Sequence, residues 1–434
     1  MSRGATRREF LHRSALTAAG FWVAGTCAGA QGRSPNDKLN IGIVGVASRG
    51  AANARSVASE NIVALCDVND DHLAEAAKKY PQAKTYIDWR KMLDQKDIDA
   101  VVVSTTEHTH APISITAMRQ GKHVYCEKPL AHSVREARLM RETAKQMKVA
   151  TQMGTQIHAT DNYRRVVELV QSGAIGPVRE AHVWVDQAIE GPVERPQETV
   201  PVPPNLHWDL WLGPAPFRPY HPCYFTKRSL SWQNWWDFGN GALGDMGSHT
   251  IDLAFWALEL QAPTTVEAEG PLPVRAETYP DHLIVRWEHP ARGNRPPVKL
   301  TWYDSHNRPK APQGVDLSKW HLGIMFVGDQ GTLLADYGKR MLLPEADFKD
   351  FQPPPPSIPP SLGHHEEWLR ACKTGSPTLC NFDYSGALIE NNLLGTVAFR
   401  AGKKLEWDPI NLKARNCPEA DPFLRSHYRE GWAL

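Results

Sequence analysis

The 434-residue chain lacks a surplus of charge of either sign, with 49 Lys and Arg residues against 48 Asp and Glu residues. A protein that neutralises nucleic-acid phosphates needs a basic surplus, so this balance argues against nucleic acid as a partner. The seven cysteines include no C-x-x-C pair, which argues against a zinc site. Hydrophobic residues make up 41% of the chain and charged residues 22%, a composition that excludes a disordered protein. The length predicts two or three domains, at about 150 residues per domain.

The uncharged stretch near the N-terminus is slightly short for a membrane-spanning helix. It follows the pair Arg7-Arg8, runs from Ser14, and ends at Ala28-Gly29-Ala30, a sequence typical of a cleavage site. Paired arginines before such a stretch resemble a twin-arginine export signal. We therefore expect residues 1–30 to be a signal peptide and the protein to be periplasmic or secreted, with no stable membrane span after processing. The alternative is a basic arm ahead of a short core helix.

Strand and helix patterns alternate in the first third of the chain. The strand 98–104 is too apolar to alternate between two faces, which is typical of a buried parallel strand. Expected strands are 39–46, 61–66, 98–104, 123–127 and 149–153; expected helices begin near Ala51 and cover 71–80, 112–120 (with Pro112 in the first turn) and 133–147. The alternation predicts an α/β fold with a doubly wound parallel sheet of the Rossmann type over residues 38–155.

A glycine-containing loop joins the first strand to the first helix of this domain. Gly45 permits a tight turn and Gly50 permits close packing of helix on strand, so the helix N-terminus can face a pyrophosphate. Asp67 lies 22 residues after Gly45, near the expected position of a ribose-binding acid, which favours NAD over NADP. The alternative is an ordinary strand–helix turn with a capping aspartate. Candidate nucleotide contacts are Gly45, Ala47 (where a middle glycine is usual), Ser48, Arg49 (which leaves NADP possible), Gly50 and Asp67.

Three further segments resemble the Gfo/Idh/MocA oxidoreductases, and in particular their secreted, twin-arginine members. They are Glu127-Lys128-Pro129, the strand end from Val103 to His110 (with Thr106 where proline is common), and the block from Gly241 to His249. The resemblance implies that Thr105, His108, Glu127 and Lys128 lie at the cofactor. It also implies a C-terminal α/β domain, residues 156–434, built on a largely antiparallel open sheet, and possible association into a homo-oligomer.

Lys128, Asp245 and His249 are the candidate catalytic residues. Lys128 follows a parallel strand at its carboxyl end, where ligands bind in such sheets, and burial would let it relay a proton. A histidine of near-neutral pKa can accept the proton of a hydroxyl as it becomes a carbonyl, and Asp245, four residues earlier, can orient the ring or bind a neighbouring hydroxyl. The alternatives are a structural cap, or a divalent metal held by Asp245, His249 and Asp252; the resemblance favours acid–base chemistry without metal.

The stretch from Glu190 to Asn240 is rich in Pro and Trp and poor in periodicity. Such long loops are usually functional, so Trp235 and Trp236, together with Asp252, are candidate sugar contacts. The alternative for each Trp is a small satellite core under the loop. His364-His365 is expected to be a solvated helix start rather than a metal site.

These features predict an NAD(P)-dependent oxidoreductase that acts on a sugar, polyol or glycoside hydroxyl. Because little free NAD is available outside the cytoplasm, an exported enzyme is expected to hold its cofactor tightly and to restore it in each cycle. That argument keeps open a redox-neutral glycoside hydrolase, which oxidises, eliminates, hydrates and reduces its substrate. A third possibility is a non-catalytic sugar-binding protein.

Overall fold

A computed structural model describes residues 37–187, 194–225 and 231–432. The predicted signal peptide, residues 1–30, lies outside these ranges. Residues 38–434 form one compact unit, in which the two regions expected at 38–155 and 156–434 contact each other. Within the described ranges, no helix has both the length and the apolar character needed to cross a bilayer.

The first region is a six-stranded parallel sheet with the strand order β3-β2-β1-β4-β5-β6. This order confirms the predicted Rossmann-type sheet. The central strand β4 (Ala100–Val103) is fully buried, as its unbroken apolar sequence predicts. The remaining strands are β1 (Asn40–Val44), β2 (Asn61–Cys66), β3 (Lys84–Tyr86), β5 (His123–Cys126) and β6 (Thr151–Met153), and the helices are α2 (Arg49–Ser56), α3 (Asp70–Lys79), α4 (Trp89–Leu93), α5 (Glu107–Arg119) and α6 (Val134–Met147).

Helix α5 differs from expectation at its N-terminus, whereas helix α6 begins within one residue of the predicted position. Helix α5 begins at Glu107, five residues earlier than predicted, so Pro112 lies inside the helix rather than in its first turn. Helix α6 begins after Ser133, whose side chain accepts from the backbone of Glu136 while Glu136 accepts from that of Ser133, a reciprocal capping box. The sequence therefore predicts both helices correctly. The early start of α5 brings Glu107 into the interior.

The second region is built on a nine-stranded sheet with the order β13-β12-β11-β7-β10-β9-β8-β14-β15. Of the strand pairings that the structure describes in this second sheet, only the β7–β10 pairing is parallel, which confirms the largely antiparallel sheet. Its strands are β7 (Val178–Val185), β8 (Thr265–Glu269), β9 (Ile284–His289), β10 (Val298–Tyr303), β11 (Leu322–Gly328), β12 (Thr332–Ala335), β13 (Arg340–Leu343), β14 (Leu405–Asp408) and β15 (Lys413–Ala414), and the helices are α7 (Asp161–Gln171), α8 (Trp208–Leu212), α9 (Gly241–Asp245), α10 (Gly247–Ala257), α11 (His364–Thr374) and α12 (Phe382–Ala401).

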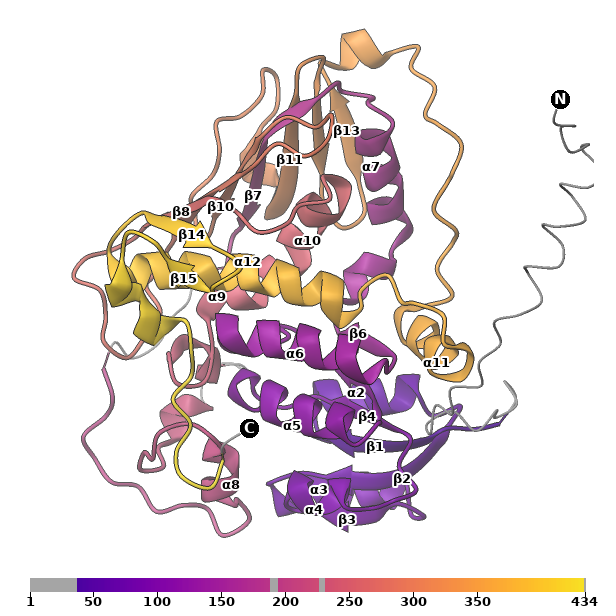
Figure 1. Cartoon of the computed structure of the whole chain (residues 1–434), viewed down its shortest axis with the longest axis vertical. Coiled ribbons are helices and arrows are strands. Elements are labelled where there is room, and N and C mark those ends of the chain that lie inside the picture. The colour runs from indigo at the N-terminus through magenta and orange to yellow at the C-terminus, as the bar shows by residue number, and fades with distance from the viewer. Residues whose placement is uncertain (1–36, 188–193, 226–230, 433–434) are drawn as a thin grey trace, which may run out of the picture. The chain divides into compact units, whose positions relative to one another are not determined.

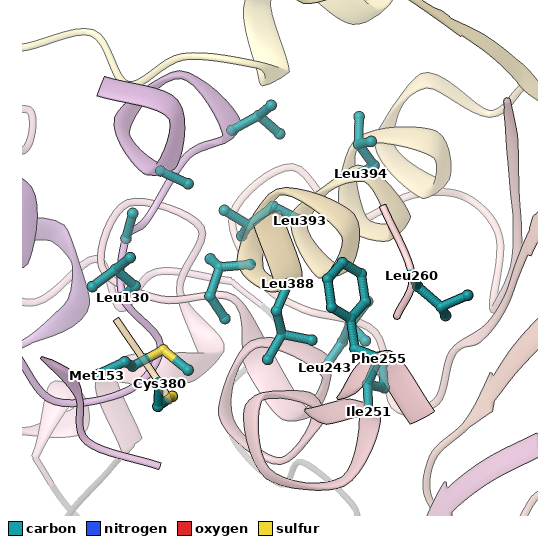
Figure 2. Packing of buried hydrophobic residues seen from close by; sticks show 14 of the residues in the cluster. Leu130, Met153, Leu243, Ile251, Phe255, Leu260, Cys380, Leu388, Leu393 and Leu394 are labelled. Atoms are coloured by element: carbon teal, nitrogen blue, oxygen red, sulfur yellow. The ribbon is translucent and has the colours of Figure 1, made fainter. Parts of the chain in front are cut away.

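Helix α12 lies between the two sheets and packs on both regions (Figure 1). Fifteen of its residues are buried, which is why it shows no polar face. Figure 2 shows Leu388 and Leu393 of this helix between Leu130 and Met153 of the first region and Leu243 and Ile251 of the second. At the edge of this contact Arg138 of α6 forms an ion pair with Glu390, its Nη2 2.7 Å from Oε2. Helix α12 therefore fixes helices α9 and α10 relative to the parallel sheet.

The paired histidines at the start of α11 are not solvated, contrary to expectation. His364 is buried and its Nε2 lies 2.8 Å from the carbonyl oxygen of Met153. The His365 ring stacks on Tyr125, with centroids 4.7 Å apart, and its Nε2 lies 3.0 Å from Oδ1 of Asn53. Both rings pack between α11 and the parallel sheet. Their hydrogen-bond partners there lie more than 200 residues away in sequence.

Candidate active site

The loop after β1 has the geometry of a nucleotide cradle. Gly45 has φ +79°, and a Cβ there would lie 2.4 Å from the carbonyl oxygen of Ser104. A Cβ on Gly50 would lie 1.8 Å from the carbonyl oxygen of Gly45. Both positions therefore require glycine, and the turn aims the N-terminus of α2 at the adjoining cavity. This fits the pyrophosphate of a dinucleotide.

Asp67 sits at the carboxyl end of β2, with its carboxylate fixed by two backbone groups. Its Oδ2 accepts from the N–H of Val46 at 2.9 Å, and its Oδ1 accepts from the N–H of Asn69 at 2.9 Å. Each oxygen keeps acceptor capacity, because a carboxylate oxygen has two lone pairs. The carboxylate is therefore held at the mouth of the cavity, where a ribose hydroxyl could donate to it.

The cavity beside this loop has a volume of about 400 Å³. Eight of the ten residues predicted to contact the nucleotide line it: Gly45, Ala47, Ser48, Arg49, Asp67, Thr105, Glu127 and Lys128. The other two do not. Gly50 supports the turn from behind, and His108 is buried, with its Nε2 3.1 Å from the carbonyl oxygen of Trp211.

The Trp-rich loop covers the nucleotide cavity, although it was expected to form a wall around a sugar. Trp211 and Trp232 line the cavity directly. Nearby, the backbone of the loop bonds to the turn after β2: Asp70 N–H donates to the carbonyl of Asn205, and His207 N–H donates to that of Val68. The described parts of the loop therefore form a strap across the nucleotide cavity, and we call residues 205–225 and 231–238 the strap.

The candidate substrate contacts Trp235 and Trp236 are both buried, with relative exposures of 1% and 6%. Trp235 packs inside an aromatic cluster of the strap, as the satellite-core alternative predicted. Asp252 is fully buried: its Oδ2 lies 2.9 Å from Nδ1 of His158, and its Oδ1 accepts from the hydroxyl of Tyr384 at 2.7 Å. These three residues do not line the cavity beside Lys128, and the prediction that they contact the sugar finds no support in their positions.

Lys128 and Asp245 form a buried ion pair between the end of β5 and the end of α9. The lysine side chain is 15% exposed and the aspartate side chain 5%. Burial by itself would raise the pKa of Asp245, but the ammonium of Lys128 and a hydrogen bond from Nε2 of Gln187 (3.2 Å to Oδ2) lower it below its ordinary value. The carboxylate therefore stays charged and holds the ammonium beside the cavity that Lys128 lines.

His249 is oriented by Thr155 rather than by Asp245. The hydroxyl of Thr155 donates to the carbonyl of Ser248 at 3.0 Å and lies 2.8 Å from Nδ1 of His249. When that hydroxyl donates to Ser248, Nδ1 of His249 is the donor to Thr155, and in this tautomer the Nε2 lone pair can accept a proton. The role that the sequence assigned to Asp245, ring orientation, thus falls to a threonine 94 residues away.

The protonation of His249 also differs from expectation. Burial, and then the nearby ammonium of Lys128, lower its pKa to about 3 rather than leaving it near neutrality. The ring is therefore neutral at physiological pH, and it can act as a hydrogen-bond acceptor. Asp245 and His249 lie on two short helices, α9 and α10, that adjoin at Met246, so they share a site but not one continuous helix. Two residues of the metal set that the sequence left open have different partners: Asp245 is paired with Lys128 and Asp252 with His158.

Sequence reasoning missed Glu107, which is fully buried near the ion pair. Its Oε2 accepts from Nδ2 of Asn240 at 3.2 Å, and its Oε1 has no hydrogen-bond partner in the described part of the chain. Burial raises the pKa of this carboxyl to about 8, with a further contribution from the charge of Asp245. Glu107 is therefore a neutral acid at pH 7, and no local pattern reveals this, because α5 was expected to begin later.

Two models of one oxidoreductase family match the chain. The NAD-binding Rossmann-fold domain matches residues 39–155 and the C-terminal alpha/beta domain matches residues 182–279. A levoglucosan dehydrogenase from Pseudarthrobacter phenanthrenivorans is 26% identical over 227 residues, 50% of each chain. A glycosyl hydrolase family 109 protein from Saccharopolyspora erythraea is 29% identical over 201 residues, 40% of this chain and 44% of that one. The chain thus spans about half the length of these curated relatives.

Among solved structures, the WlbA dehydrogenase from Bordetella pertussis, in complex with NADH and UDP-GlcNAcA, aligns with a TM-score of 0.62. The alignment covers 87% of this chain and 99% of that one at 17% identity. At that identity the likeness supports the fold. The structural alignment covers more of the chain than the two family models do.

Glu107→Gln is expected to remove a pH dependence of stability. Because the pKa of Glu107 is raised in the folded state, the folded chain holds one more proton than the unfolded chain between about pH 5 and 8. The free energy of unfolding therefore falls as the pH rises through this window, by an amount of the order of a few kcal/mol. The glutamine keeps the Asn240 contact but carries no such proton, so urea unfolding at pH 5.5 and 8.5 should show a smaller fall. The exposed control Glu345→Gln should behave like the parent, and an equal fall in both variants would contradict the assignment.

Proposed function

Because the chain belongs to the Gfo/Idh/MocA oxidoreductase family, we propose that it is an NAD-dependent oxidoreductase acting on a hydroxyl of a sugar, polyol or glycoside. The observation that carries the proposal is the ion pair of Lys128 with Asp245 at the edge of the nucleotide cavity, with a neutral His249 nearby. The named relatives that act on levoglucosan and glycosides support carbohydrate as the substrate class.

The chain's own residues have separable roles in this chemistry. Gly45 and the N-terminus of α2 would hold the pyrophosphate, Gly50 would allow the turn behind them, and Asp67 would bind the adenosine ribose. A bound nicotinamide would supply the hydride acceptor. The ammonium of Lys128, held by Asp245, would donate a hydrogen bond to the substrate oxygen as negative charge develops on it.

The hydroxyl proton then needs an acceptor, and Nε2 of His249 would supply one in the tautomer that carries its proton on Nδ1. Protonation of this ring is costly while Lys128 carries a full charge nearby, because that charge lowers the pKa of His249. A hydrogen bond from Lys128 to an oxygen that becomes negative would offset the cost. The two groups would therefore act together, and neither should suffice alone.

The cofactor is proposed to be NAD, held tightly. A fixed carboxylate at Asp67 would repel a 2′-phosphate, and the strap would have to open before a dinucleotide could leave. Export by the N-terminal segment 1–30, with the mature protein in the periplasm or outside the cell, would make such retention necessary.

A second candidate is the redox-neutral glycoside hydrolase, which the family 109 relative favours. In that cycle the sugar hydroxyl is oxidised, the aglycone leaves, water adds and the carbonyl is reduced again, so no net NADH forms. The third candidate, a non-catalytic sugar-binding protein, leaves the buried Lys128–Asp245 pair without a role.

Protein dialysed exhaustively and then denatured is expected to release close to one nucleotide per chain. The dialysed protein should then be incubated with a panel of sugars and aryl glycosides while absorbance at 340 nm and aglycone release are followed together. Accumulation of NADH supports the dehydrogenase, and aglycone release without NADH supports the hydrolase. Protein that is recovered empty, yet active once NAD is added, would contradict tight binding, and binding without turnover would contradict both enzymatic proposals.

Asp67→Ala is expected to weaken NAD binding more than NADP binding, because it removes both an acceptor for the ribose and a repulsive charge. Titration of apoprotein with each nucleotide, followed by tryptophan fluorescence, measures the two dissociation constants. The exposed control Asp94→Ala, at the end of α4, should change neither. An equal loss for the two nucleotides in Asp67→Ala would remove the basis for NAD preference.

Lys128→Met and His249→Ala are each expected to slow hydride transfer by about 10²–10⁴-fold, the usual contribution of a positioned acid–base group. The control is Lys122→Met, since Lys122 is also buried but its Nζ donates only to backbone carbonyls, at 3.1 Å to Ile98. Single-turnover NADH formation measures the step. Because the pKa of His249 is lowered to about 3, kcat/KM should show no acid limb near pH 6.5. A limb there, or near-normal turnover in either variant, would refute the assignment.

A further inference from the structure

A second cavity, of about 160 Å³, lies on the far side of His108 from the nucleotide cavity. His108 lines it, while the Nε2 of the same ring contacts the carbonyl of Trp211, which lines the nucleotide cavity. One wall is the end of α12, another is Trp236, and a third is the C-terminal segment from Pro422 to Tyr428. We call residues 422–432 the tail. The cavity is too small for a dinucleotide and is closed by residues that the proposed chemistry does not use.

Arg400, near the C-terminus of α12, presents its guanidinium to this cavity. The guanidinium carbon lies 4.3 Å from the ring centroid of Phe423 and 5.0 Å from that of Trp236. Among the described residues its side chain has neither a hydrogen bond nor an ion pair. Burial lowers the pKa of Arg400 to about 10, so the group is still charged at pH 7. The guanidinium offers up to five N–H donors, and no acceptor among the described residues takes them.

Two carboxylates in this part of the molecule already have other partners. Asp237, which lines the cavity, forms an ion pair with Arg218. Glu136 accepts at Oε1 from the hydroxyl of Tyr428 and at Oε2 from the backbone N–H groups of His132 and Ser133. A second arginine, Arg425 in the tail, also lines the cavity, and its side chain is likewise without a partner in the described ranges. Two arginines and one aspartate line the cavity, and the aspartate, Asp237, is also paired with Arg218, so the lining carries a net positive charge.

We propose that this cavity binds a small oxyanion, a carboxylate or a phosphate, between Arg400 and Arg425. The fork of N–H groups on a guanidinium matches two oxygens of such an anion, and the aromatic faces of Trp236 and Phe423 hold it in place. The anion would supply the acceptors that the protein lacks. This site goes beyond the proposed function, since it requires neither hydride transfer nor a sugar.

Binding at this site would also be coupled to the strap. Beyond Tyr428 the tail continues to Arg429, whose backbone N–H donates to the carbonyl of Pro214 at 3.1 Å and whose side chain contacts Asp209 at 2.5 Å. Trp432 then packs on Trp89, with ring centroids 6.4 Å apart. An anion that ties Arg425 to α12 would hold the tail, and through it the strap, against the nucleotide cavity.

The test uses the protein saturated with NAD, so that the pyrophosphate site is filled, in a buffer without phosphate or carboxylate. Isothermal titration with inorganic phosphate and, separately, with acetate and glycerate identifies which oxyanion binds. Arg400→Met, which keeps the apolar stem against the aromatic rings, and Arg425→Met, on an exposed position, should each weaken binding about tenfold or more. The control is Arg415→Met, an exposed arginine beside Asp408.

A saturable heat in the parent that persists in Arg415→Met and is lost in the other two variants is the expected result. The bound anion should also slow the release of NAD into a dilute trap, and this effect should vanish in Arg425→Met. No binding of any of the three anions at millimolar concentration, or equal binding in all variants, would overturn the site. Either result leaves the activity assays of the proposed function unaffected, so the two can fail separately.

Discussion

The ion pair between Lys128 and Asp245 is the contact on which the arrangement of the site depends. It joins the carboxyl end of a strand in the parallel sheet to the end of a helix in the second region, 117 residues later in the chain. Removing one partner of such a pair leaves an uncompensated buried charge, which costs about 3–5 kcal/mol. The pair is therefore tolerated only while the two regions hold a fixed relative position. The burial of α12 between Leu130 and Leu243 provides that constraint through apolar contacts (Figure 2).

The same constraint explains why the ionisable groups around the pair are neutral. Glu107 and His249 are both shielded from water, and burial favours the neutral form of each. It raises the pKa of Glu107 to about 8 and lowers the pKa of His249 to about 3. The Lys128–Asp245 pair thus adjoins two neutral hydrogen-bonding groups, while the charge of Arg49 also acts on His249. A charge that develops on a substrate oxygen near Lys128 interacts with the ammonium more strongly than it would in bulk water, because burial lowers the local dielectric. This burial makes the site suited to moving a hydride and a proton together.

Much of the first region could be predicted from sequence, because its signals are local. The apolar strands, the glycines at 45 and 50, and the acid at 67 each follow from short-range geometry, and the structure places all of them as expected. The functions of Thr155, Glu107 and His365 could not be predicted, since each depends on a partner that only the tertiary fold brings near. The Trp-rich loop shows the limit between the two cases. Its composition indicated a special role, but only the contacts of Asn205 and His207 with the turn after β2 reveal that it covers the nucleotide cavity.

The strap and the tail together give the nucleotide cavity a cover made from segments far apart in the chain. Trp211 and Trp232 form the inner surface of this cover, and Arg429 and Trp432 hold it from outside. Opening the cavity requires the aromatic cluster around Trp208 and Trp235 to move as a body, because these rings pack on one another as well as on the sheet. Release of a dinucleotide would thus expose several large apolar side chains at once, at about 25 cal/mol per Å² of apolar surface. A cover of this kind favours a cofactor that stays in place between turnovers, and it makes the tail, the part of the cover that a small ligand can reach, the natural point at which its opening would be controlled.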